Sequence, residues 1–171
     1  MIHSIGHSTR TAQAFHDLLE VHGIARLADV RTLPMSRRHP HFNSERLGSD
    51  LAARGIDYKH MAGLGGLRKP RPDSINTGWK HSGFRGYADY MESASFQAAL
   101  EDLVQFAAAA PTAVMCAEAM WWKCHRRLIA DALSARGIPV RHIMSAARAT
   151  PHVMSDFATI LEGRVSYPAL L

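Results

Sequence analysis

Short apolar segments alternate with segments of helical spacing along most of the chain, and this alternation limits the possible folds more than any other feature. The apolar segments predict strands at residues 2–5, 24–30, 56–61, 112–116 and 139–144. Apolar residues spaced for one helix face predict helices at residues 11–23, 44–55, 87–91, 96–110, 124–136 and 153–161. We therefore expect an α/β protein, a single-domain three-layer α/β/α Rossmann-like fold with a mainly parallel sheet of about five strands.

The length of 171 residues suits one domain and is too short for two comfortable ones. We expect a single domain over residues 1–171, with its core at 1–145 and a C-terminal extension at 146–171. Residues 62–86 are rich in Gly, Pro, Arg and Lys and have no period of their own. A loop of that length is usually a lid, a binding segment or disordered.

Composition narrows the expected cellular compartment of the protein and the expected classes of binding partner. Because no apolar run is long enough to span a bilayer and the N-terminus does not resemble a signal peptide, we expect a cytoplasmic protein without a membrane partner. Two cysteines are too few for a disulfide scaffold. The net charge of +5, with eleven histidines besides, favours an anionic small molecule or nucleic acid as partner, although the same charge also serves solubility alone.

Reactive and charged residues gather where the predicted strands end. Ligands of open parallel sheets bind beyond the carboxyl ends of the strands. The residues that follow or close the first four strands are His7, Ser8, Asp29, Arg31, Gly65, Gly66, Arg68, Cys116 and Glu118. The opposite ends carry the turn residues Gly23, Gly55, Pro111 and Gly137. This asymmetry predicts a functional site at the carboxyl edge of the sheet.

The densest cluster is Cys116-Ala-Glu118 followed by Cys124-His125-Arg126. A helix N-terminus has free N–H groups and a partial positive charge, so we expect a lowered pKa for Cys124 and a favourable place for an anion. The structural alternative is that both cysteines are core residues and Glu118 pairs with Arg126.

Our preferred hypothesis for the chemistry is acid–base catalysis by Glu118 on a nucleotide, a nucleic acid or another phosphorylated or anionic compound. Arg31, Arg68 and Arg126 would hold the anion, and the cysteines would pack or tune the site. The alternative from another class is a non-catalytic nucleotide- or nucleic-acid-binding module with a structural or redox cysteine pair. The sequence requires no cofactor and leaves the oligomeric state open.

Two further chemistries are considered and not preferred. Cys116, Cys124 and a histidine, His125 or His7, could bind zinc in a hydrolase or deaminase, with Glu118 as the proton shuttle. The second half of the deaminase motif, Pro-Cys-x-x-Cys, is missing, and neighbouring helical residues such as Cys124 and His125 should point in different directions. A cysteine nucleophile of the phosphatase type would need an Arg six residues after Cys116, where Trp122 stands.

Other features support binding less specifically. Asp29 and Arg31 lie on one side of a strand and either pair structurally or present a polar edge. Gly65-Gly66 with Arg68 resembles a phosphate-cradling loop but fits neither the dinucleotide nor the P-loop pattern. Two loops rich in basic and aromatic residues suit base stacking and phosphate pairing. Their basic residues are Arg37, Arg38, His39, His41, Arg68, Lys69, Arg71, Lys80, His81 and Arg85, and the aromatic residues between them are Phe42, Trp79, Phe84 and Tyr87.

Several short motifs together resemble one family. They are Ile5-Gly6-His7-Ser8, Asp29-Val30-Arg31 with Pro34 and Ser36-Arg37, Leu64-Gly65-Gly66, Phe84-Arg85-Gly86-Tyr87, and Cys116-Ala117-Glu118 with Cys124-His125-Arg126. In these motifs the chain resembles the domain-of-unknown-function family 488 (DUF488), from the first strand to the fifth. The resemblance implies a compact α/β fold and a polar pocket, without an established reaction.

The candidate site therefore has two groups of residues. The candidate catalytic residues are Glu118, Cys116, Cys124, His125 and His7. The candidate substrate- or anion-binding residues are Arg31, Arg68, Arg126, Ser8, Asp29, Gly65, Gly66, Arg85 and Tyr87.

Overall fold

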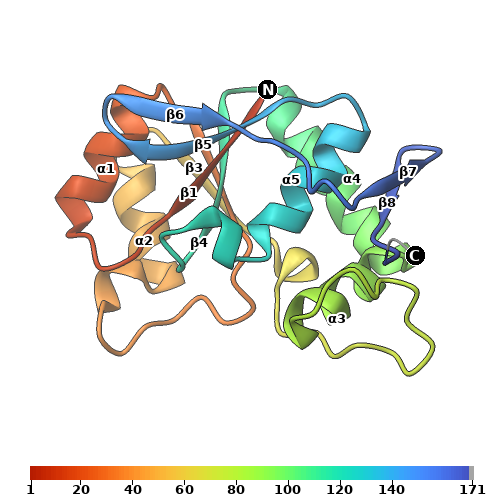
Figure 1. The fold of residues 1–171 in the computed structure, drawn as a ribbon. Helices are drawn as coiled ribbons and strands as arrows, with labels where there is room; N and C mark the ends of the chain where they lie inside the picture. The colour runs from red at the N-terminus through yellow and green to blue at the C-terminus, as the bar shows by residue number, and fades with distance from the viewer. Residues whose placement is uncertain (170–171) are drawn as a thin grey trace.

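Six strands form one central sheet in the computed structural model, which describes residues 1–169 (Figure 1). They are β1 (Ile2–Gly6), β2 (Arg26–Asp29), β3 (Asp57–His60), β4 (Thr112–Cys116), β5 (Val140–Ser145) and β6 (Arg148–Pro151). The strand order is β3-β2-β4-β1-β5-β6; the first five are parallel, and β6 pairs antiparallel with β5. The predicted α/β fold with a mainly parallel sheet is confirmed, with one strand more than expected.

Five α-helices cover the two faces of the sheet: α1 (Ala12–Val21), α2 (Ser44–Ala52), α3 (Ser82–Met91), α4 (Ala94–Ala108) and α5 (Arg126–Ala135). The side chains of α1 and α2 pack with alternate residues of the strands, such as Ala113 and Met115, in one core. The side chains of α3, α4 and α5 pack with Val114 in the other core. Successive strand residues point to opposite faces, so the sheet serves both cores and the fold has three layers.

The ends of the helices follow the expected capping chemistry. Thr11 Oγ1 accepts a hydrogen bond from Ala14 N at 3.1 Å, as the predicted N-cap of α1. Helix α3 begins at Ser82, earlier than the predicted Tyr87, because His81 Nδ1 accepts from Gly83 N and caps the added turn. The remaining part of the predicted 62–86 loop contains one 3-10 turn, η2 (Ala62–Leu64).

The C-terminal segment differs from the prediction. The helix predicted at residues 153–161 is wrong, because after β6 the chain forms a two-stranded hairpin of β7 (Thr159–Leu161) and β8 (Arg164–Ser166). Glu162 and Gly163 have φ values of 50° and 74°, the left-handed conformation that a tight hairpin turn requires. This Glu-Gly pair is the turn signal that helical spacing alone missed. The predicted extension, residues 146–171, ends outside the described residues.

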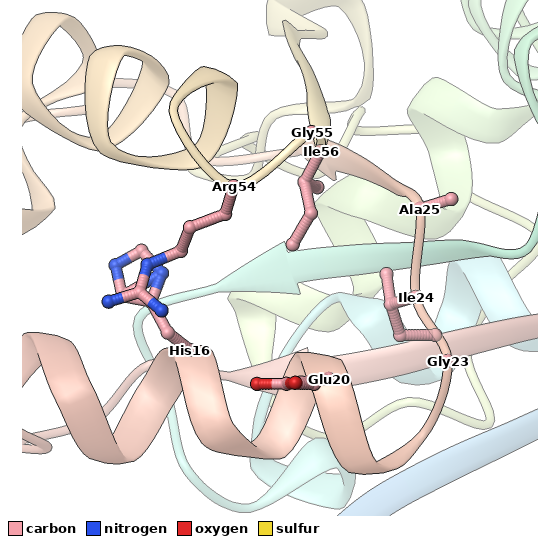
Figure 2. Close-up of a pocket in the computed structure, with 8 residues that line it drawn as sticks. All are labelled: His16, Glu20, Gly23, Ile24, Ala25, Arg54, Gly55 and Ile56. Carbon is pink, nitrogen blue, oxygen red and sulfur yellow. The ribbon is translucent and has the colours of Figure 1, made fainter.

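The edge of the sheet opposite to the predicted site carries a cavity of about 370 Å³ (Figure 2). It lies where β2 and β3 begin and is bordered by Gly23 and Gly55, two of the predicted turn glycines. His16 and Arg54 are among the residues that line it. None of its eight lining residues belongs to the predicted site. Within residues 1–169, no helix is long and apolar enough to cross a membrane.

Gly6 marks the closest backbone contact at the carboxyl end of β1. A Cβ atom at this position would lie 2.0 Å from the carbonyl oxygen of Glu118 and 2.9 Å from Cα of Ala119. Both obstacles are backbone atoms, which cannot move aside as a flexible side chain can. The glycine therefore allows the loop after β4 to pass directly over the end of β1.

We predict that Gly6→Ala lowers the free energy of unfolding by about 3 kcal/mol or more, because the methyl group overlaps backbone. Gly23→Ala is the control, since its added Cβ meets nothing within 4 Å and costs only the positive φ of 63°, about 1–2 kcal/mol. Urea denaturation of both variants measures the difference. Equal losses would contradict the close contact at Gly6.

A candidate active site at the carboxyl ends of the strands

A cleft opens at the carboxyl ends of the strands, at the predicted edge. It consists of two adjoining hollows of about 520 and 360 Å³. Both are lined by Gly66, Leu67, Cys116, Ala117 and His125. The larger is also lined by His81, Gly83, Phe84, Tyr87, Glu118, Lys123 and Cys124, and the smaller by His7, Arg31, Thr32, Leu33, Met35 and Ser36. The cleft thus brings the five candidate catalytic residues to one place.

Two chain segments bring the cysteines together. Cys116 is the last residue of β4, and Cys124 lies between the 3-10 turn η3 (Trp121–Lys123) and helix α5. Cys124 has extended backbone (φ −129°, ψ 151°), and His125 is the N-cap of α5. The expectation that Cys124 and His125 lie on one helix and point apart is therefore wrong. One ligand atom from each of Cys116, Cys124 and His125 lies within 4.8 Å of the others.

The two thiols have opposite electrostatic environments. A hydrogen bond from the Cys116 thiol, supported by His125 and Arg126, holds the pKa of Cys124 well below its ordinary value despite burial. The same hydrogen bond and burial raise the pKa of Cys116. Cys124 is 5% exposed, and neither cysteine is in a disulfide. The arrangement favours a thiolate at Cys124 and a protonated thiol at Cys116.

The imidazole of His125 is held from its far side. Its Nε2 lies 3.0 Å from the carbonyl oxygen of Val30, which can only accept, so Nε2 carries a proton. Nδ1 lies 3.6 Å from Cys124 Sγ. A Cβ at Gly66 would lie 3.1 Å from Nδ1, so a glycine lets this loop approach the ring closely. Phosphate binding by the Gly65-Gly66 loop, which the sequence suggests, stays a prediction.

Arg126 lies beneath the cysteines and is 2% exposed. Its Nε donates to Cys124 Sγ at 3.4 Å, and its Nη1 donates to Ser4 Oγ at 3.2 Å. Its Nη2 donates to the carbonyl oxygen of Glu118. The guanidinium group therefore contacts the thiolate and the backbone, and Arg126 does not line the cleft. Ser4 was missed by the sequence analysis because it lies inside a strand.

Arg31 and Asp29 form a buried ion pair. Arg31 Nη2 lies 2.6 Å from Asp29 Oδ2, and Tyr58 donates to the same oxygen at 2.6 Å. Asp29 is 0% and Arg31 5% exposed. Of the two interpretations that the sequence left open, the geometry supports the structural pair. Arg31 also donates from Nη2 to the carbonyl oxygen of Phe42 at 2.8 Å.

His7 joins this pair to the cleft. Its Nδ1 donates to the carbonyl oxygen of Ser8 at 2.9 Å, which leaves Nε2 free to accept from Arg31 Nη1 at 3.3 Å. Burial lowers the pKa of His7 to about 4, so the imidazole is neutral near pH 7. Its ring stacks on Phe42 with centroids 4.2 Å apart. Ser8 itself has a positive φ of 51°.

The other predicted residues are divided between the cleft and the loop that borders it. Glu118 is exposed at the cleft, and its Oε1 accepts from Met120 N at 3.0 Å. Arg68 lies over the ring of Tyr90 at 3.6 Å. Arg85 donates to the carbonyl oxygen of Trp79 at 2.9 Å. Buried Tyr87 donates to the carbonyl oxygen of Leu64 at 2.7 Å. Arg68, Arg85 and Tyr87 thus hold the long segment after β3 in place.

The three converging groups also meet the chemical requirements of a metal site. Two thiolates and an imidazole nitrogen suit zinc, with an open position toward the cleft. However, the guanidinium of Arg126, 3.4 Å from Cys124 Sγ, already supplies the positive charge that a metal would supply there. The geometry therefore favours a hydrogen-bonded thiolate, and zinc stays a prediction.

Fold and site together define an α/β protein with a cysteine pair at the carboxyl ends of parallel strands. The chain belongs to the family described as domain of unknown function DUF488, whose model matches residues 11–133. This match confirms the predicted family; the matched residues include neither the Ile5-Gly6-His7-Ser8 motif nor the first and fifth strands. No curated protein and no solved structure matches the chain. The family description names no reaction, so only the geometry of the site bears on function.

We predict that Arg31→Met lowers the free energy of unfolding by about 3–5 kcal/mol, because Asp29 would be left buried without its cation. The control is Lys59→Met, which breaks a 2.7 Å bridge to Asp102 between half-exposed side chains and should cost less than about 1 kcal/mol. Chemical denaturation near neutral pH compares the two. A similar small loss in both would show that Asp29 does not depend on Arg31.

Proposed function

We propose that this protein is an enzyme that uses the Cys124 thiolate as a nucleophile on a small substrate bound in the cleft. One observation carries the proposal: Cys116, His125 and Arg126 converge on the Cys124 sulfur, which lines the larger hollow. Activated nucleophiles have this arrangement of a lowered pKa and an adjacent proton carrier. In the preferred hypothesis of the sequence analysis the cysteines only pack or tune the site, and the donors around Cys124 support a larger role.

The first chemical step forms a covalent intermediate. The Cys124 thiolate attacks an electrophilic carbonyl carbon, a sulfur–carbon bond forms, and the bond to the leaving group breaks. The leaving group takes the proton of the Cys116 thiol, so Cys116 becomes the thiolate. Arg126 and His125 stabilise the negative charge of the pair before attack.

The second step returns the enzyme to its starting state. Water attacks the thioester, Cys124 leaves as the thiolate, and the released proton returns to Cys116. Glu118, exposed at the same cleft, is placed to take that proton from the water and pass it on. This keeps the proton-transfer role that the sequence analysis gave to Glu118.

The lining of the cleft supports a substrate that is anionic and partly apolar. Lys123 and His81 line the larger hollow beside Phe84 and Leu67. Arg31 and Arg126 were expected to bind the anion, but their guanidinium groups are engaged by Asp29 and by Cys124 and Glu118. We therefore assign the anion contact to Lys123 and the ring contact to Phe84. A nucleotide is one member of this class.

We predict that p-nitrophenyl acetate gives a burst of one nitrophenolate per chain, with the acetyl group on Cys124 by mass spectrometry. Because the Cys124 pKa is lowered, the thiolate persists below neutral pH, so the burst rate should stay nearly constant between about pH 8 and pH 6. An ordinary thiol such as glutathione slows about tenfold per pH unit over this range. Cys124→Ser should abolish the burst.

Three outcomes would contradict the proposal. A burst that survives Cys124→Ser with the acetyl group on Cys116 would move the nucleophile. Stoichiometric zinc in protein purified under reducing conditions without chelator would support the zinc hydrolase or deaminase instead. The absence of a burst, together with no effect of Glu118→Gln, would favour the non-catalytic binding module.

Glu118→Gln should keep the burst and slow the later turnover by about a hundredfold or more.

A further inference from the structure

A line of buried hydrogen bonds leads away from the cysteine cluster. It starts at Arg126, whose Nη1 donates to Ser4 Oγ at 3.2 Å. Ser4 Oγ lies 2.9 Å from His142 Nδ1, on β5. His142 Nε2 lies 2.9 Å from His152 Nδ1, and His152 Nε2 lies 2.7 Å from Asp131 Oδ1. The line therefore joins the thiolate site to the C-terminal segment.

With both histidines neutral, the two ends of this line determine the direction of every hydrogen bond in it. Arg126 can only donate, and an ionised Asp131 can only accept. The Ser4 hydroxyl must then donate to His142, His142 must donate from Nε2 to His152, and His152 must donate from Nε2 to Asp131. Both histidines then have the same tautomer. Burial lowers the pKa of His142 to about 3, which agrees with its neutral form.

The far end of the line is firmly anchored. Asp131 is 0% exposed and accepts hydrogen bonds from Ser155 Oγ at 3.0 Å and from Tyr167 Oη at 2.9 Å, besides that from His152. The backbone N–H of Ser155 also donates to it at 3.3 Å. This number of donors is the environment of an ionised carboxylate.

His142 supports the cysteine site in a second way. The ring of Trp121 stacks on His142 with centroids 4.1 Å apart and an interplanar angle of 4°. Trp121 opens η3, the turn between the two cysteines. His142 therefore contacts Ser4, which orients Arg126, and the η3 turn, which leads to Cys124. Neither His142 nor His152 falls within residues 11–133, the part that the family model matches.

We propose that His142, His152 and Asp131 are positioning residues, which hold Ser4 and Arg126 so that Arg126 Nε points at Cys124 Sγ. On this proposal the C-terminal segment, through His152, completes the site. The inference rests on the proposed function, because it needs Cys124 as the ionised thiol. It adds residues that touch no substrate and act through Arg126 and through the η3 turn.

The test removes one hydrogen bond of the line and compares the effect with that of removing one hydrogen bond outside the line. In His152→Gln, the side-chain amide can still donate to Asp131 but no longer accepts from His142. Ser4→Ala interrupts the line at its other end and serves if His152→Gln fails to fold. Tyr167→Phe is the matched control, because it removes a hydrogen bond to the same Asp131 carboxylate and leaves the line intact.

The readout is the rate of alkylation by iodoacetamide across pH, mapped to each cysteine by mass spectrometry, together with the stability of each variant. His152→Gln and Ser4→Ala should move the pH of half-maximal alkylation upward by about one unit, which slows the reaction about tenfold below the wild-type midpoint and leaves the rate at high pH unchanged. Tyr167→Phe should lose stability and keep the wild-type profile.

Two results would overturn the inference and are distinguishable. If the wild type reacts at low pH and both variants keep its profile, the positioning role is wrong and the proposed function stands. If the wild type itself reacts like an ordinary thiol, the proposed function fails, and the positioning role fails with it.

Discussion

The guanidinium group of Arg126 lies almost fully buried between β1, the loop after β4 and the start of α5. It donates hydrogen bonds to a sulfur atom, a hydroxyl group and a backbone carbonyl oxygen, all from different parts of the chain. A buried cation without such partners would be strongly destabilising. The folding of the strand ends around Arg126 and the ionisation of Cys124 therefore depend on each other. Gly6 permits this arrangement, because it lets the Glu118 backbone reach the guanidinium group.

Most of the architecture could be predicted from local patterns. Short apolar segments and helical spacing predicted the five parallel strands, and parallel strands collect their carboxyl ends at one edge. Cys116 and Glu118, at the end of β4, therefore line the same cleft as His7, at the end of β1, although the two segments are distant in sequence. The C-terminal hairpin was missed, because the turn at Glu162-Gly163 is a short signal within a segment whose apolar spacing also fits a helix.

The partners of the charged residues could not be predicted in the same way. The sequence shows which residues carry charge, but it does not show that Arg31 binds Asp29 within the core or that Arg126 faces a thiolate. The line through His142 and His152 depends on contacts between β5, β6 and α5, which no local pattern encodes. The direction of the Cys124 side chain depends on the residue at which α5 begins. Because α5 begins at Arg126 and not at the predicted Cys124, the side chains of Cys124 and His125 converge instead of pointing apart.

The ultraviolet absorbance of the cysteine thiolates tests the central claim most directly, because it needs neither a substrate nor a reagent. Wild type and Cys124→Ser are titrated with acid under reducing conditions without metal. Wild type should keep the absorbance of one thiolate at about pH 6, where an ordinary cysteine is protonated, and Cys124→Ser should lose it. If the two proteins are indistinguishable at that pH and thiolates form only above about pH 8, Cys124 is not the ionised residue that the site is built around.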